Sequence, residues 1–267
     1  MPFSGAMKKS KPAIIAVIPA RYGSTRFPGK ALALIKGRPM VQWVHERTKR
    51  SAYFDRVIVA TDDARILKAV TDFGGEAMMT SPDHATGTDR IAEVARSLDC
   101  DIIVNVQGDE PLIAPAMIDA AVKPLADDPS IPMGTIAKRI TDPAEVRDPN
   151  VVKVVLDAGG FALYFSRAPI PWDRDRWAGA TSSADAKFDG AWFKHIGLYV
   201  YRRDFLLAYA AMPQTPLERT EKLEQLRALE RGHRIRVVIT EQESFGVDIP
   251  GDLGKILKLI EESGIDS

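Results

Sequence analysis

The sequence contains very little cysteine, no long apolar run and no excess of charge of either sign. Cys100 is the only cysteine among 267 residues, which excludes an internal disulfide and a thiolate metal cluster and is typical of a reducing compartment. No apolar run approaches the roughly 18 residues that a membrane-spanning helix needs. Thirty-six basic residues balance thirty-six acidic ones, so no net charge attracts nucleic acid or an anionic membrane. We therefore expect a cytoplasmic globular protein that binds neither nucleic acid nor membrane.

The residues that are present have an ordinary enzyme composition, with 45% hydrophobic and 27% charged residues. Apolar runs alternate with amphipathic stretches, which is the pattern of a mainly parallel α/β sheet. Buried strands are predicted at 13–18, 56–61 and 101–106, each leading into a helix. Residues 1–12 are polar and lack an apolar signal core, so we expect a flexible N-terminal extension before one domain at 13–267.

The sequence pattern changes after about residue 131. Two short strands at 151–156 and 161–165 flank Asp-Ala-Gly-Gly, which predicts a hairpin and not a crossover. The polar stretch 172–190 predicts a loop, and 193–201 predicts a strand. We expect a mixed-sheet insertion at about 131–205, followed by a helix that starts at a Thr215-Pro-Leu-Glu218 capping box and runs to Gly232. A strand at 235–239 and a helix at 250–262 complete the prediction.

The loop after the first strand, residues 19–30, is rich in glycine, hydroxyl groups and positive charge. Arg21, Arg26 and Lys30 lie in it, at the carboxyl end of a strand where open α/β sheets bind ligands. Glycine lets backbone N–H groups approach an anion, and the basic side chains neutralise its charge. Five residues separate Gly23 from Gly29-Lys30 where a P-loop has four, and no Gly-x-Gly-x-x-Gly fingerprint is present. The loop therefore predicts a polyphosphate site, the alternative being a merely solvated basic loop.

Carboxylates follow a strand and precede a helix at two other places. Asp109 and Glu110 come after the strand at 101–106, and Asp248 comes before Pro250. Magnesium takes one or two carboxylates together with phosphate oxygens and water. Asp109 and Asp248 are therefore candidate magnesium ligands, although each could instead cap the helix that follows it. Glu110 is expected to make a structural hydrogen bond.

Residues 194–201 predict a strand with one polar and one apolar face. Alternation places His195, Gly197, Tyr199 and Tyr201 on one face. This face suits a polar ligand, or it is simply solvated. Glu224 and Gln225 belong to the predicted helix with an apolar stripe and could be plain helix surface. His45, His84 and His233 show no zinc-binding spacing and are expected to be structural.

Six segments together resemble one family. They are IPARYGSTRFPGK, TGTDRIAEV, NVQGDEPLI, KHIGLYVYR, LEQLRALE and FGVDIPGDL, spread from about residue 13 to 260. The chain is similar to the 3-deoxy-manno-octulosonate cytidylyltransferases, the CMP-Kdo synthetases. Small departures occur at Gly23, Phe27, Ala31 and Asp89, where Ala, Leu, Pro and Glu are expected. The resemblance implies an α/β fold with a three-layer, Rossmann-like nucleotide-diphospho-sugar transferase core, made of a mainly parallel sheet with the mixed-sheet insertion.

The resemblance also implies an activity and its site. The anomeric hydroxyl of the sugar acid would attack the α-phosphorus of CTP, giving CMP-Kdo and pyrophosphate for lipopolysaccharide synthesis in the cytoplasm. Catalysis would use Arg21, Lys30, Asp109 and Asp248, the two aspartates holding Mg²⁺. The nucleotide would contact Pro19, Ala20, Arg21, Ser24, Arg26, Lys30, Thr86, Gly87 and Gln107, with Gln107 reading the cytosine. The sugar acid would contact Arg90, Arg167, His195, Tyr199, Glu224 and Gln225. A homodimer formed through the insertion is expected.

Three other functions remain open. A CMP-sugar synthetase for 8-amino-Kdo or a sialic acid would share the first loop and the aspartates and would differ around Tyr199. A nucleotide-binding regulator without catalysis would not need Arg21, Lys30, Asp109 and Asp248 together. A sugar-transferring enzyme normally has Asp-x-Asp at a strand end, and this chain has Gln107-Gly-Asp109-Glu110 there.

Overall fold

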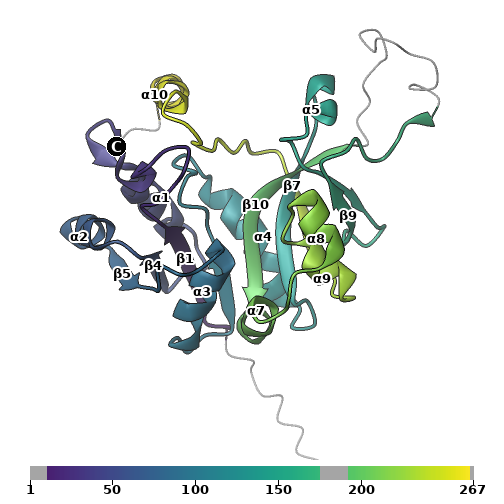
Figure 1. Ribbon diagram of the computed structural model, residues 1–267, viewed down its shortest axis with the longest axis horizontal. Helices are drawn as coiled ribbons and strands as arrows, with labels where there is room; N and C mark the ends of the chain where they lie inside the picture. The colour runs from purple at the N-terminus through teal and green to yellow at the C-terminus, as the bar shows by residue number, and fades with distance from the viewer. Residues whose placement is uncertain (1–10, 175–191, 265–267) are drawn as a thin grey trace, which may run out of the picture.

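The computed structural model describes residues 11–174 and 192–264. These residues form a nine-stranded sheet with the strand order β11-β7-β10-β6-β1-β4-β5, to which the β8–β9 hairpin is joined through β10 (Figure 1). The path consists of β1 (Ile14–Ala20), β4 (Arg56–Thr61), β5 (Glu76–Met79), β6 (Ile102–Asn105), β7 (Met133–Arg139), β10 (Phe193–Arg202) and β11 (Ile235–Thr240). A separate small ribbon pairs β2 (Leu34–Ile35) with β3 (Arg38–Pro39). The three buried strands predicted from apolar runs are confirmed as β1, β4 and β6.

The sheet is mainly parallel, as predicted. β6, β1, β4 and β5 pair in parallel, and so do β7 and β11. β10 is the exception, because it runs antiparallel between β6 and β7. The predicted hairpin is present as β8 (Lys153–Leu156) and β9 (Ala162–Ser166). Within the proposed insertion, β7 and β10 are therefore members of the central sheet, and only the hairpin lies outside its main path.

Helices cover both faces of the sheet and make three layers. One face of the sheet packs against α1 (Met40–Lys49), α2 (Ala64–Asp72) and α4 (Pro115–Asp127). The other face packs against α3 (Gly87–Arg96), α7 (Arg203–Ala210) and α9 (Leu226–Glu230). This burial of alternate strand residues on two opposite faces explains the near-continuous apolar runs in the sequence. The remaining helical elements are η1 (Lys30–Leu32), α5 (Pro143–Arg147), α8 (Pro216–Glu221) and α10 (Asp252–Ser263).

Two helix predictions need correction. The single helix expected from Thr215 to Gly232 is divided into α8 and α9, because Lys222 adopts a left-handed backbone conformation with φ of 54°. Pro216 still opens α8, and the Glu218 carboxylate accepts a hydrogen bond from the Thr215 backbone. The last helix begins at Asp252 and not at Pro250. Asp252 itself accepts hydrogen bonds from the backbone N–H groups of the two residues Asp248 and Ile249.

Two predictions fall largely on residues that the structure does not describe. The N-terminal extension at 1–12 and the loop at 172–190 lie mostly outside 11–174 and 192–264.

Among the described residues, 11–174 and 192–264, no helix combines the length and the apolar character needed to span a membrane.

Candidate active site

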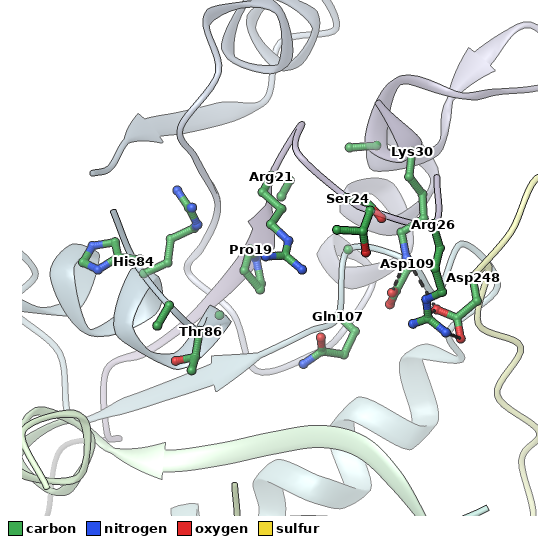
Figure 2. A pocket seen from close by; sticks show the side chains of 17 residues that line it. Pro19, Arg21, Ser24, Arg26, Lys30, His84, Thr86, Gln107, Asp109 and Asp248 are labelled. Carbon is green, nitrogen blue, oxygen red and sulfur yellow. Dashed lines mark hydrogen bonds and ion pairs between the residues drawn. The ribbon is translucent and has the colours of Figure 1, made fainter. Parts of the chain in front are cut away.

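A cavity of about 410 Å³ lies beyond the carboxyl ends of β1 and β6. The first loop, the start of α3, the segment after β6 and the approach to α10 line it (Figure 2). The lining contains all the predicted nucleotide and metal residues, namely Pro19, Ala20, Arg21, Ser24, Arg26, Lys30, Thr86, Gly87, Gln107, Asp109 and Asp248. Segments more than 200 residues apart in the chain, such as those of Arg26 and Asp248, therefore meet at one site. The first loop and the segment of Asp109 meet there as their places at strand ends predict.

Two basic and two acidic side chains gather at one end of this cavity. The Lys30 ammonium lies 2.6 Å from Asp109 Oδ2 and 4.0 Å from Asp248 Oδ1. It also donates to the Val247 carbonyl at 2.8 Å. Arg26 binds the Asp248 carboxylate through both terminal nitrogens, at 2.9 and 3.2 Å. His84 and Thr86 lie at the opposite end in Figure 2, with Arg21 and Gln107 between. The charged end offers both cations for phosphate and carboxylates for a metal ion.

Neither aspartate caps a helix, which removes the structural alternative for both. The residue before α4 is Ala114, so Asp109 is well separated from that helix. The residue before α10 is Gly251, and the capping carboxylate there belongs to Asp252. Asp109 and Asp248 instead point toward Lys30.

The carboxylates of Asp109 and Asp248 suit a hard cation only when phosphate oxygens supply further ligands. Among residues 11–174 and 192–264, no three His, Cys, Asp or Glu side chains converge on a common metal position. Asp109 and Asp248 supply carboxylate oxygens, which magnesium prefers, and magnesium ordinarily takes its remaining ligands from substrate phosphates and water. The residues therefore fit a magnesium ion that arrives with a polyphosphate.

Glycines allow the loops around the cavity to approach one another. Gly29 has φ of 71°, and a Cβ there would lie 3.0 Å from the Tyr22 ring. The Tyr22 carbonyl accepts hydrogen bonds from Ser24 and Gly29, which closes the first loop. A Cβ on Gly108 would lie only 2.6 Å from the Pro19 carbonyl oxygen. Gly108 thus lets the ends of β1 and β6 come together under the cavity.

A second, smaller cavity of about 170 Å³ adjoins the first. It is lined by Gly87, Thr88, Asn105, Gln107, Met133, Tyr199, Tyr201, Tyr209, Glu224 and Gln225. Gly87 and Gln107 line both cavities. Gln107, predicted to read a base, therefore lies where the two cavities meet.

Three of the six predicted sugar-acid residues line the smaller cavity. Strand alternation along β10 places Tyr199 there, while Ile196, Leu198 and Val200 pack into the core on the other face. Glu224 and Gln225 reach it from the turn between α8 and α9, not from a helix face as predicted. Burial raises the pKa values of both Tyr199 and Glu224. The cavity combines phenols, amides and one carboxyl group, a set that suits a polyhydroxylated ligand.

The other three predicted sugar-acid residues, Arg90, Arg167 and His195, do not line the smaller cavity. Arg90 is buried in α3, where its guanidinium binds Asp62 at 2.8 Å, and it lines the larger cavity. Arg167 lines neither cavity, and its Nε donates to the Glu221 carbonyl at 2.8 Å. His195 also lines neither, and it packs between the rings of Phe165 and Tyr199. Their contacts with a sugar acid stay predictions.

Sequence reasoning did not find several polar residues of the two cavities, among them His84, Asn105 and Tyr209. His84, expected to be structural, lines the larger cavity and pairs with Glu93. Its position two residues before Thr86 was the available signal. Asn105 and Tyr209 line the smaller cavity. Tyr209 comes from α7, and no motif connects that helix with the site.

The burial of the His195 side chain can be tested through the pH dependence of folding stability. Its ring bonds the Thr135 hydroxyl at 2.9 Å, and burial lowers its pKa to about 3. The unfolded chain binds this proton near pH 6.5, so folding stability falls as pH drops from 6.5 toward 3. We expect wild-type protein to lose about 2 kcal/mol more than His195→Gln between pH 7 and 5. Urea unfolding at both pH values measures it, and equal losses would contradict the burial.

Known proteins are similar to this chain over most of its length. Residues 15–235 match the family model described as cytidylyltransferase. The 3-deoxy-manno-octulosonate cytidylyltransferase of Trichlorobacter lovleyi is 62% identical over 242 residues, which cover 91% of this chain and 96% of the relative. That of Geotalea daltonii is 60% identical, covering 94% and 99%.

Solved structures are similar to this chain as well. A CMP:2-keto-3-deoxy-manno-octonic acid synthetase in complex with CTP has a TM-score of 0.85 and 42% identity, covering 94% of this chain and 99% of that one. A cytidylyltransferase from Leptospira borgpetersenii, at 18% identity and a TM-score of 0.61 over 94% of this chain and 87% of its own, shares the fold. The chain therefore belongs to the cytidylyltransferase family, and within it to the 3-deoxy-manno-octulosonate cytidylyltransferases.

Proposed function

We propose that this enzyme transfers the cytidylyl group of CTP to the anomeric hydroxyl of 3-deoxy-manno-octulosonate, forming CMP-Kdo and pyrophosphate. The observation that supports this most strongly is the junction of two unlike cavities at Gln107. The larger has a charged end suited to a triphosphate, and the smaller has phenol, amide and carboxyl groups suited to a sugar. The junction is where the α-phosphorus and the attacking hydroxyl would meet.

The chemistry needs alignment and charge neutralisation more than a reactive side chain. The anomeric oxygen forms a bond to the α-phosphorus while the bond from that phosphorus to the β-phosphate oxygen breaks. The electron pair of that bond leaves with pyrophosphate, and the hydroxyl proton passes to solvent water. Arg21, Arg26 and Lys30 stabilise the negative charge that grows on the leaving group. We assign no general base to the protein, since the imidazole of His195 lines neither cavity.

Asp109 and Asp248 would hold magnesium together with the triphosphate. When bound, the ion supplies polarisation of the phosphate and a lowered pKa of the attacking hydroxyl. The two carboxylates exchange partners in this scheme, because Lys30 and Arg26, which bind them in this structure, turn to phosphate oxygens. Charge balance at the site is thereby kept when nucleotide and metal bind together.

The proposal is tested by pyrophosphate release across nucleotides and acceptors. We expect release with CTP, magnesium and octulosonate, and little release when UTP or ATP replaces CTP. Release only with the 8-amino analogue or with N-acetylneuraminate would contradict the acceptor assignment and leave the nucleotide site intact. Tight CTP binding without release with any acceptor would favour a regulator that does not catalyse.

Gly108→Ala is expected to weaken the nucleotide site without unfolding the protein. The added Cβ meets the Pro19 carbonyl at 2.6 Å, so the ends of β1 and β6 must separate. We expect KM for CTP to rise at least about tenfold, since misplacement by about 1 Å can cost as much as 100-fold. Gly254→Ala is the control, because a Cβ there meets nothing within 4 Å. An unchanged KM in folded Gly108→Ala would contradict the role of this contact.

We further propose that the enzyme works in the cytoplasm as a homodimer and that its product serves lipopolysaccharide assembly. CTP is a cytoplasmic metabolite, and an activated octulosonate is the donor that such assembly requires. Leu163 on β9 and Ile239 on β11 are exposed apolar side chains, 62% and 39% accessible, which supply surface for a second copy. Light scattering measures the assembly, and a monomer at working concentration would contradict it.

A further inference from the structure

The turn at residues 222–225 carries two of the groups that line the smaller cavity. Gln225 is only 4% exposed, and Glu224 lies beside it on the same turn. Lys222 opens the turn with a left-handed backbone, which is uncommon for a residue with a side chain and persists only where surrounding contacts hold it. The turn joins α8 and α9, which lie next to each other in Figure 1, and α9 also packs against β9.

A buried ion pair connects the two helices across this turn. Arg227 in α9 binds Glu218 in α8 through two hydrogen bonds, from Nε at 2.8 Å and from Nη2 at 2.6 Å. Both side chains are only 5% exposed. Neither of these two side chains lines the larger or the smaller cavity. An apolar pair of similar volume would often stabilise such a position equally well, but the two-pronged bond additionally fixes how the helices are oriented.

The same network reaches the backbone of Glu224 directly. The Tyr209 hydroxyl donates to the Glu224 carbonyl at 2.6 Å, and the Arg227 backbone N–H donates to it at 3.0 Å. The Arg227 guanidinium lies 5.0 Å from the centre of the Tyr209 ring and contacts the Tyr209 carbonyl at 3.4 Å. The Glu224 carbonyl is thus bonded by α7 and α9, and α8 is joined to both through the Arg227 side chain.

We propose that Glu218, Arg227 and Tyr209 are positioning residues that hold the 222–225 turn in the shape needed to bind the acceptor sugar. The inference rests on the proposed function, because it takes the smaller cavity as the acceptor site. The nucleotide cavity contains no member of the network. Loss of the network therefore affects acceptor binding and leaves CTP binding unchanged.

The decisive variant is the double substitution Glu218→Leu with Arg227→Met, which replaces the ion pair by apolar side chains and leaves no buried charge behind. We expect a melting temperature within a few degrees of wild type, KM for octulosonate raised about tenfold or more, and KM for CTP within twofold. Ile66→Val, on the buried face of α2, is the control for general destabilisation. We expect it to change neither the KM for octulosonate nor the KM for CTP.

The other outcomes overturn the proposal. If the folded double variant keeps the wild-type KM for octulosonate, the turn does not need the ion pair. If the KM values for octulosonate and CTP rise together, the network supports the whole fold and does not position the acceptor. If the double variant does not fold, Arg227→Lys decides, because lysine keeps the charge but cannot form the two-pronged bond to Glu218, and residue 227 lines neither of the two cavities; it should show the same split. The wild-type enzyme is measured first, and its failure to use octulosonate would contradict the proposed function and not the role of the ion pair.

Discussion

Lys30→Ala is expected to lower kcat by about 100- to 1,000-fold, the cost of removing one preorganised charge from a developing anion. Lys30 is largely buried, with its side chain 16% exposed, and its ammonium lies within ion-pair distance of both aspartates. Its loss removes charge compensation from the pyrophosphate and leaves Asp109 without its partner. KM for octulosonate should change little, because Lys30 does not line the smaller cavity.

Steady-state pyrophosphate release measures this effect, with a thermal melt to show that the variant is folded. Lys68→Ala is the matched control, since Lys68 is an exposed lysine that pairs with Asp72 on α2. We expect the control to have wild-type kcat. A kcat for Lys30→Ala within a factor of two of wild type would show that the leaving-group role is wrong.

Asp109→Asn is expected to separate metal use from nucleotide binding. The amide keeps the shape of the side chain but has a weaker oxygen donor and no charge, so kcat should fall at least about 100-fold and the magnesium concentration for half-maximal rate should rise. Metal-free CTP should bind as well as before or better, because one negative charge beside the triphosphate is removed. Calorimetry with CTP alone and magnesium titrations of the rate measure the two effects.

Asp127→Asn supplies the control, since Asp127 is an exposed aspartate at the end of α4 that pairs with Lys123. It should leave the magnesium dependence unchanged. An unaltered magnesium dependence in Asp109→Asn, with activity retained, would mean that Asp109 is not a ligand.

The nucleotide cavity could be predicted from the sequence because its parts obey a topological rule. The first loop comes after β1 and the Asp109 segment comes after β6, and the loops that leave neighbouring parallel strands lie at the same edge of the sheet. Residue type then indicates the chemistry, since Arg, Lys and Asp have few reasons to gather at a strand end except charge. The role of Asp248 depended on the resemblance, because its local sequence suited a helix cap equally well. The base-reading residues Pro19, Ala20, Thr86, Gly87 and Gln107 depended on it too, since composition does not indicate which base a site selects.

The acceptor cavity was predicted less completely, for physical reasons. The apolar stripe at Leu223, Leu226 and Leu229 indicated one helix, but it does not reveal a left-handed residue at Lys222 that interrupts it. Tyr209 reaches the cavity through packing of α7 against the sheet, which no local pattern encodes. Arg167 has a basic side chain near the end of β9, and yet backbone carbonyls engage it. Tertiary contacts decided each of these positions.

Attack of the acceptor's anomeric oxygen on the α-phosphorus, where the two cavities meet, is the step on which the proposed function depends. It is tested most directly by running the reaction in water enriched in heavy oxygen, after octulosonate has exchanged its anomeric oxygen with that water. We expect one heavy oxygen in the bridge between sugar and phosphorus of CMP-Kdo, seen as an isotope shift in phosphorus NMR, and unlabelled pyrophosphate. A CMP-sugar without the bridging label, or label in pyrophosphate, would contradict this step.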